Sequence, residues 1–196
     1  MSQDDQTIGV YDAQVATYND VVANSSDPQL AVFLAGLPDG AEVLDLGCGP
    51  GHCAAQMRDL GFRVTATDAS REMAGFAHET FGLDVQVQTF ADLDAVAAFD
   101  GVWASFSLLH APKAEMPAHL AAIHRALRPG GLLWLGLKTG TGESRDRIGR
   151  FYAYYSDTEI SGLLADAGFT VTGRTTGEGT GLDGSIWPWI VLGAHA

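Results

Sequence analysis

Basic residues are scarce in this chain. Its 196 residues include 11 lysines and arginines against 24 aspartates and glutamates, which gives a formal net charge of −13 at pH 7. An acidic surface repels phosphate backbones and anionic lipid headgroups. We therefore expect no nucleic-acid partner and no membrane partner.

Cysteines and long apolar runs are scarce as well. Cys48 and Cys53 are the two cysteines, and we interpret them as small packing residues rather than a disulfide. His52 lies beside Cys53, but no further ligand is spaced to make a metal site, so we expect no metal. The apolar runs around 132–137 and 187–192 are too short to span a bilayer. The polar, acidic first residues do not resemble a secretory signal, which favours a cytoplasmic location.

Strands and helices alternate along the chain, which has the length and the 46% hydrophobic content of one globular domain. Apolar periodicity, capping residues and glycine or proline breaks indicate where each element begins and ends. They predict helices over 11–24, 28–37, 52–60, 71–81, 114–128 and 158–167. They predict strands over 42–46, 62–67, 84–88, 99–106, 132–137, 169–175 and 186–192. Residues 139–150 and 177–184 are expected to be loops.

This alternation indicates an α/β fold, a mostly parallel sheet with right-handed crossovers. The last two strands have no helix between them and should pair as an antiparallel hairpin. Pro188 interrupts the last strand, where a proline cannot donate a backbone hydrogen bond, so a bulge or bend is expected there. Trp187 and Trp189 should share one face of that strand and pack in the core.

A glycine-rich turn follows the first predicted strand. Residues 43–51 read Val-Leu-Asp-Leu-Gly-Cys-Gly-Pro-Gly, and Asp68 ends the second strand, 21 residues after Gly47. Glycines let the backbone approach a ligand closely, and a carboxylate at the end of the second strand can accept hydrogen bonds from ribose hydroxyls. This pattern predicts a site for an adenosine cofactor, although a turn that binds nothing and an N-cap role for Asp68 are the alternatives.

These residues resemble the class I methyltransferases that use S-adenosylmethionine, in particular small bacterial single-domain members. The resemblance rests on the glycine turn, on Asp68, and on residues 99–110 with 127–131, and it covers residues 41–193. It implies a three-layer Rossmann-like sheet of seven strands in the order 3-2-1-4-5-7-6, with strand 7 antiparallel. It also implies one methyltransferase domain over 1–196, with N-terminal lid helices in 1–38, a cofactor-binding core in 41–193 and a substrate-side loop in 139–156.

The resemblance assigns residues to S-adenosylmethionine and its product S-adenosylhomocysteine. The turn would contact the methionine end and the ribose, Asp68 the ribose hydroxyls, and Ala69 and Met73 the adenine. The full set of expected cofactor-binding residues is Asp45, Gly47, Cys48, Gly49, Asp68, Ala69, Met73, Thr89, Phe90 and Ser105. Family members often carry an acidic residue where this chain has Thr89, and Asp92 is the nearest substitute.

His110 is the candidate general base, because it follows the fourth strand at the carboxyl edge of the sheet, where ligands of such folds bind. The alternative is a histidine that only positions a loop. Tyr11 and Tyr18 lie seven residues apart on one face of the first predicted helix and are expected to form a lid or to pack. Arg150 and Tyr152 are candidates for the substrate side. Arg145, Arg147 and Arg150 would bind an anionic acceptor or pair with surface carboxylates.

The sequence thus predicts S-adenosylmethionine-dependent methyl transfer to a small-molecule acceptor, by a monomer or homodimer. The core fold uses nearly all of the chain and leaves little surface for a macromolecular acceptor. A nicotinamide-dependent oxidoreductase is one alternative, although its Gly-x-Gly-x-x-Gly spacing fits this turn poorly. A non-catalytic protein that binds the cofactor is the other.

Overall fold

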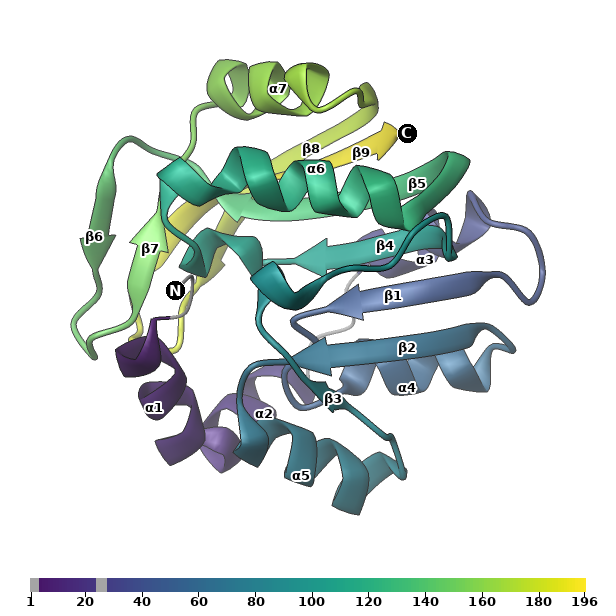
Figure 1. Cartoon of the computed structure of the whole chain (residues 1–196). Helices are drawn as coiled ribbons and strands as arrows, with labels where there is room; N and C mark the ends of the chain where they lie inside the picture. Colours follow the sequence, from purple (N-terminus) through teal and green to yellow (C-terminus); the bar gives the residue numbers. More distant parts are fainter. Residues whose placement is uncertain (1–3, 24–27) are drawn as a thin grey trace.

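A seven-stranded sheet forms the centre of the computed structural model, which describes residues 4–23 and 28–196 (Figure 1). The strand order is β3-β2-β1-β4-β5-β9-β8. The strands β3, β2, β1, β4 and β5 are parallel, and β9 runs antiparallel to both β5 and β8. Since β8 and β9 are the sixth and seventh strands of this sheet, the predicted order 3-2-1-4-5-7-6 with an antiparallel seventh strand is confirmed.

The parallel half of the sheet is built from short, apolar strands. Their bounds are β1 (Glu42–Leu46), β2 (Arg63–Asp68), β3 (Gln86–Val87), β4 (Phe99–Ser105) and β5 (Leu127–Lys138). Four of the five residues of β1 are buried, as expected for a central strand covered on both faces. The third strand is shorter than the predicted 84–88, because at the edge of the sheet only Gln86 and Val87 pair with β2.

Helices cover both faces of the sheet. On one face lie α3 (Pro28–Ala35), α4 (His52–Asp59) and α5 (Arg71–Phe81), and on the other α6 (Met116–Ala126) and α7 (Asp157–Asp166) (Figure 1). Each face buries its own apolar cluster, one around Phe33 and Trp103 and the other around Leu120 and Leu135. The predicted three-layer architecture is therefore present.

Capping residues fix the helix that follows β2. The Ser70 hydroxyl accepts a hydrogen bond from the backbone N–H of Met73, 3.0 Å away, as the sequence predicts for an N-cap. Gly82 ends α5 in the left-handed conformation. The start of α7 is one residue earlier than predicted, because Ser156, not Asp157, is the N-cap.

The N-terminal helix is broken in two. The predicted helix over 11–24 is instead α1 (Asp5–Ala13) and α2 (Val15–Ala23), separated at Gln14, whose N–H donates to the Tyr11 carbonyl. Asn24 lies outside the described residues. Both helices lie beyond the carboxyl ends of β1 and β2 (Figure 1). No residue type in the sequence marks this break.

Two stretches that the sequence assigns to loops or helix carry strands. Within 139–150 and just after it, β6 (Glu143–Arg145) pairs with β7 (Phe151–Ala153) as a hairpin. The helix expected over 114–128 ends at Ala126, and Leu127 already pairs with Phe99 of β4. Leu132 pairs with Gly101, so residues 128–131 bulge out of the strand around the left-handed Gly130.

The closing hairpin is longer than predicted. β8 (Thr170–Thr180) includes the first half of the stretch 177–184 expected to be a glycine-rich loop, and β9 (Ile186–His195) follows it. The register shifts between Val171 and Gly173, not at Pro188, so the expected irregularity is misplaced. Pro188 lies beyond the last β9 residue that pairs with β5, which is Trp189, and so leaves the central pairing intact.

Trp187 and Trp189 pack into different apolar clusters, the first beside Tyr154 and the second beside Phe106. The prediction that they share a packing face is therefore wrong. Both cysteines are free. Within the described ranges no helix is long and apolar enough to cross a membrane.

Candidate active site

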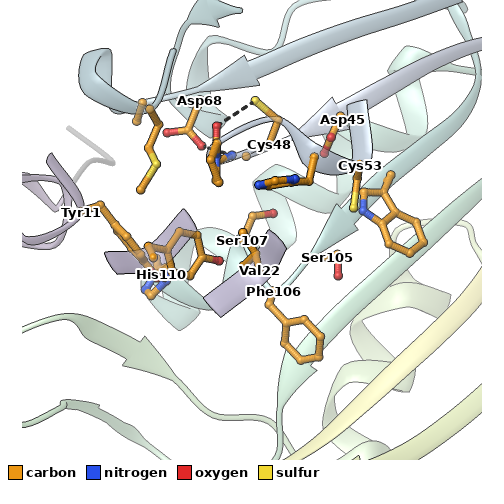
Figure 2. Close-up of a pocket in the computed structure, with 18 of the residues that line it drawn as sticks. Tyr11, Val22, Asp45, Cys48, Cys53, Asp68, Ser105, Phe106, Ser107 and His110 are labelled. Atoms are coloured by element: carbon orange, nitrogen blue, oxygen red, sulfur yellow. Dashed lines mark hydrogen bonds between the residues drawn. The ribbon is translucent and has the colours of Figure 1, made fainter. Parts of the chain in front are cut away.

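A cavity of about 660 Å³ opens at the carboxyl ends of β1, β2 and β4, beneath α1 and α2. Its volume lies within the range of small-molecule sites, and its place is where ligands bind in open α/β sheets. Figure 2 shows Asp45, Cys48 and Asp68 along one side of the cavity and Tyr11, His110 and Phe106 along the other.

The glycine turn forms the first side. The N–H groups of Gly47 and Cys48 both donate to the Thr67 carbonyl, which fastens the turn to the end of β2. Gly47 has φ of 78°, and a Cβ there would lie 2.4 Å from the Cβ of Ser107. Only glycine fits this position, both for its backbone conformation and for its space.

Asp68 braces the same turn. Its carboxylate, seen in Figure 2, accepts the Gly49 N–H at 2.7 Å. It also accepts the Ser70 N–H at 2.8 Å. Burial raises the pKa of this carboxyl group, while these backbone hydrogen bonds oppose the rise. The N-cap of α5 is Ser70, so the alternative that Asp68 serves only as a helix N-cap does not hold. Each carboxylate oxygen retains a further acceptor site, and the side chain lines the cavity.

Asp45 is a buried carboxyl group with an unused oxygen. It lines the cavity with 3% of its surface exposed, and its Oδ2 has no hydrogen-bond partner within the described structure. Burial, and secondarily the charge of Asp68, raise the pKa of Asp45 to about 8. A cationic hydrogen-bond donor placed in the cavity would satisfy this oxygen.

His110 lies on the other side, in the short helix η2 (Leu108–His110) that follows β4. Its Nδ1 lies 2.6 Å from the Phe151 carbonyl of β7 and therefore carries the proton. Its Nε2 accepts a hydrogen bond from the Tyr11 hydroxyl at 2.9 Å. Burial lowers the pKa of His110 to about 4, and the nearby Arg150 and Lys138 charges add to that effect. The imidazole is thus neutral, with one defined tautomer.

Arg150 and Asp146 support Tyr11 from behind. The Arg150 guanidinium donates to the Tyr11 hydroxyl at 2.9 Å and forms a buried ion pair with Asp146 at 2.8 Å. Their side chains are 2% and 1% exposed. A continuous chain of hydrogen bonds therefore runs from Asp146 through Arg150 and Tyr11 to His110, joining the β6–β7 hairpin to α1 and to the cavity wall.

Comparisons with known proteins identify the family. A relative from Staphylococcus carnosus, described as an uncharacterized methyltransferase, is 32% identical over 161 residues, covering 80% of this chain and 75% of its own. A family described as "Methyltransferase domain" matches residues 43–131. This chain belongs to the methyltransferases. The class I, S-adenosylmethionine-dependent family that the glycine turn and Asp68 resemble is confirmed, and the nicotinamide alternative is set aside.

Two further relatives of this methyltransferase have named substrates. The Burkholderia thailandensis 1,6-didemethyltoxoflavin-N1-methyltransferase, solved with 1,6-didemethyltoxoflavin and S-adenosylhomocysteine, has a TM-score of 0.77 and 25% identity, covering 100% of this chain and 91% of its own. The malonyl-[acyl-carrier protein] O-methyltransferase of Enterobacter lignolyticus is 35% identical over 122 residues, covering 59% of this chain but only 45% of its own. The present chain uses S-adenosylmethionine as its methyl donor.

The cavity of the methyltransferase fits that donor. The unpartnered Asp45 oxygen suits an amino group, and the spare acceptor sites of Asp68 suit the two hydroxyls of a ribose. Every predicted cofactor residue lines this cavity: Asp45, Gly47, Cys48, Gly49, Asp68, Ala69, Met73, Thr89, Phe90 and Ser105.

Two expectations for the methyltransferase need correction, and one open alternative is decided. Asp92 is exposed, caps η1 (Phe90–Asp92) through Thr89 and does not line the cavity, so it does not replace the acidic residue missing at position 89. Arg150 and Tyr152 lie behind Tyr11 and His110 rather than on the cavity wall. The arginines are paired internally, Arg145 with Asp4, Arg147 with Asp183 and Arg150 with Asp146.

Sequence reasoning missed several residues of the wall. Phe106, Ser107, Glu178 and Trp189 all line the cavity. Phe106 and Ser107 directly follow β4, so their place at the carboxyl edge was a usable signal. Glu178 was not recognised because it stands in a glycine-rich stretch that reads as a loop. Two of the glycines in this stretch, Gly177 and Gly179, leave room for the Trp189 ring. A Cβ at Gly177 would lie 2.4 Å from that ring.

Proposed function

We propose that this methyltransferase transfers the methyl group to a small-molecule acceptor, with Tyr11 and His110 receiving the acceptor's proton. The observation that carries the proposal is the hydrogen bond from the Tyr11 hydroxyl to His110 Nε2 on the cavity wall opposite the glycine turn. A cavity covered by α1 and α2 suits a small acceptor better than a macromolecular one.

S-adenosylmethionine, when bound, supplies a methyl group on a sulfonium, which leaves as a neutral thioether and needs no general acid. The protein therefore has to align the acceptor and exclude water, effects worth about 7–11 kcal/mol in well-oriented reactions. Tyr18 packs edge-to-face on Tyr11 with ring centroids 5.3 Å apart, and both rings line the cavity, which supports the lid role that we propose for them. The break at Gln14 places them on separate helices.

The proton would leave the acceptor through Tyr11. An O–H or N–H nucleophile becomes strongly acidic once it has gained a methyl group, so even a weak base suffices. The Tyr11 oxygen would take that proton while passing its own to Nε2 of His110. Arg150 donates to the Tyr11 oxygen and holds it in line, and the Phe151 carbonyl keeps the proton on Nδ1. Arg150 is then a positioning residue, and Tyr152 supports the His110 ring at 4.7 Å.

The cofactor roles follow from the same geometry. Asp68 would bind the ribose hydroxyls, and Asp45 the amino group. Ala69 and Met73 would contact the adenine beside Thr89 and Phe90, and Gly47, Cys48, Gly49 and Ser105 would contribute backbone. The relatives support both nitrogen and oxygen as the acceptor atom, since one is named an N1- and the other an O-methyltransferase.

A methyl-transfer assay tests the proposal. The enzyme is incubated with methyl-labelled S-adenosylmethionine and a panel of phenols, amines and nitrogen heterocycles, and the best acceptor is then used with Tyr11→Phe and His110→Gln. We expect kcat to fall by about 10²-fold or more in both variants, as for loss of a general base. S-adenosylhomocysteine affinity should stay within about twofold of the wild type, since neither side chain is assigned a contact with the cofactor.

His78→Gln is the matched control, because His78 is exposed and does not line the cavity. Unchanged kcat in His110→Gln would remove His110 from the mechanism. Label found only in protein or acyl-carrier acceptors, and never in the panel, would contradict a small-molecule acceptor.

A further inference from the structure

Phe106 is held at the cavity wall in a strained conformation. It directly follows β4 and has φ of 54°, in the left-handed region, where a side chain other than glycine costs about 1–2 kcal/mol. Its N–H donates to the Gly136 carbonyl at 3.0 Å, and its ring packs so closely over Gly136 that a Cβ there would lie 3.3 Å from it. Strain of this kind collects at ligand sites.

Trp189 completes a corner with Phe106. The two ring centroids are 6.2 Å apart with an angle of 82° between the planes. Gly177 and Gly179 on the facing strand leave the space that the indole occupies. Two rings at nearly a right angle let a third flat ring stack on one and meet the edge of the other, the arrangements that aromatic pairs prefer.

No lysine or arginine supplies positive charge to the described cavity wall. That wall contains the carboxyl groups of Asp4, Asp45, Asp68 and Glu178. The three arginines of the β6–β7 region are engaged with aspartates. Lys138 is buried, with its Nζ 3.7 Å above the Tyr152 ring rather than in the cavity. An anionic acceptor would therefore find no cationic side chain on this wall to offset its desolvation cost.

We propose that Phe106, Trp189 and Glu178 form the acceptor subsite, and that the acceptor is a flat aromatic or heteroaromatic molecule without negative charge. This inference rests on the proposed function and specifies the chemical class of its acceptor. The two rings select a planar molecule, and the Glu178 carboxylate favours a donor or a cationic group at its edge. The engaged Arg150 excludes the earlier alternative of an anion-binding arginine.

Ligands of one size and different charge test the subsite. Naphthol, naphthylmethylamine, naphthoate and decahydronaphthol are titrated into the full chain saturated with S-adenosylhomocysteine, and binding is followed by ligand-observed NMR and calorimetry. Naphthol and naphthylmethylamine should bind about tenfold more tightly than naphthoate and decahydronaphthol, as an aromatic contact of about 1.4 kcal/mol implies. Naphthoate binding as tightly as naphthol, or no binding by any of the four, would overturn the proposal.

Variants locate the binding. Trp189→Leu should weaken naphthol about tenfold, whereas Trp187→Leu, on the same strand but off the cavity, should leave it unchanged. Glu178→Gln should abolish any preference for naphthylmethylamine over naphthol while leaving naphthol affinity unchanged. Should Trp189→Leu fail to fold, the charge series and Glu178→Gln still decide the outcome.

Two failures are distinguishable. If S-adenosylhomocysteine itself does not bind the wild type, the proposed function and this subsite fall together. If it binds and the four ligands are not discriminated, only the acceptor subsite falls.

Discussion

Asp45 and His110 are both uncharged at neutral pH, for the same reason. Burial raises the pKa of the Asp45 carboxyl group to about 8 and lowers the pKa of the His110 imidazole to about 4. The cavity thus has a protonated carboxyl group on one side and a neutral base on the other. A cationic amino group beside Asp45 would favour its ionised form, so binding should release a proton.

Calorimetry at several pH values detects that proton. We expect S-adenosylhomocysteine to bind more tightly as pH rises from 6 toward 7.5, by up to about tenfold per pH unit, because the carboxylate form is scarce below the Asp45 pKa of about 8. Titrations in buffers of different ionisation enthalpy should show release of up to about one proton. In Asp45→Asn both effects should vanish. Affinity independent of pH in the wild type would contradict the assigned role.

His110 makes a different prediction. A base must be neutral to act, and with a pKa of about 4 the imidazole is neutral throughout the physiological range. The rate at saturating cofactor should therefore be flat between about pH 6 and pH 8 as far as this residue is concerned. An acidic limb with a midpoint near the ordinary histidine pKa, absent in His110→Gln, would show that His110 is solvated and that the hydrogen bonds to Tyr11 and Phe151 do not form.

At the level of single residues, the sequence predicted the site residues whose place is determined by the backbone of the turn and of the strand ends. Gly47 and Asp68 were found because the turn needs a residue without a side chain and the strand end places a carboxylate beside it. The partners of His110 were not predictable, since Tyr11 and Phe151 reach it from positions 99 and 41 residues away. Such contacts depend on how the elements pack.

The β6–β7 hairpin and α1 are joined by polar contacts. Asp4 pairs with Arg145, Thr7 accepts the Phe151 N–H at 2.7 Å, and Tyr11 bonds Arg150. Asp12 accepts a hydrogen bond from Ser70 and ties the same helix to the start of α5. The helix α1 is therefore attached to the hairpin along its length and to the start of α5 near its C-terminal end.

Breaking the buried ion pair should destabilise the fold. Asp146→Asn keeps the shape but leaves the Arg150 charge buried without its partner, which typically costs about 3–5 kcal/mol. The free energy of unfolding, measured by urea denaturation, should fall by about that amount. Asp59→Asn removes an exposed pair with Arg58 and should cost at most about 1 kcal/mol. Equal effects of the two substitutions would mean that the Arg150 pair is solvated.

Substitution of Gly47 in the turn can be compared with substitution of Gly82, a second glycine in the left-handed conformation. Gly47→Ala should weaken S-adenosylhomocysteine binding about 10²-fold or abolish it, because the new methyl group meets Ser107 and forces the turn to move. Gly82 has φ of 66° but open space around it and lies away from the cavity. Gly82→Ala should cost only backbone strain, about 1 kcal/mol of stability, with binding intact. Normal binding by a folded Gly47→Ala would place the ligand elsewhere.

Elements were predictable where one pattern dominates. Apolar runs identified β1, β4 and the central part of β5, and Ser70 marked the start of α5. The β6–β7 hairpin was not predicted because its strands are three residues each, and all three residues of β6 are exposed. The extension of β8 to Thr180 was hidden by alternating glycines, whose role is to accommodate Trp189 on the neighbouring strand.

Across the whole molecule, sheet order and site position follow from the order of elements alone. The glycine turn after β1, Asp68 after β2 and His110 after β4 meet because parallel strands bring their carboxyl ends to one edge. Charge adds a second constraint: the −13 net charge and the absence of lysine and arginine from the described cavity wall both favour cationic or neutral ligands. Arg145, Arg147 and Arg150 are paired with aspartates and lie off that wall, and the sequence could not predict these pairings.

The central claim is that the cavity between the glycine turn and His110 holds S-adenosylmethionine through Asp68. Calorimetric titration with S-adenosylhomocysteine, comparing the wild type, Asp68→Ala and the exposed control Asp59→Ala, tests it most directly. We predict wild-type binding, an unchanged control and a loss of about 10²-fold or more in Asp68→Ala, the value of two hydrogen bonds to a charged group. Binding of equal strength in all three proteins would contradict the account.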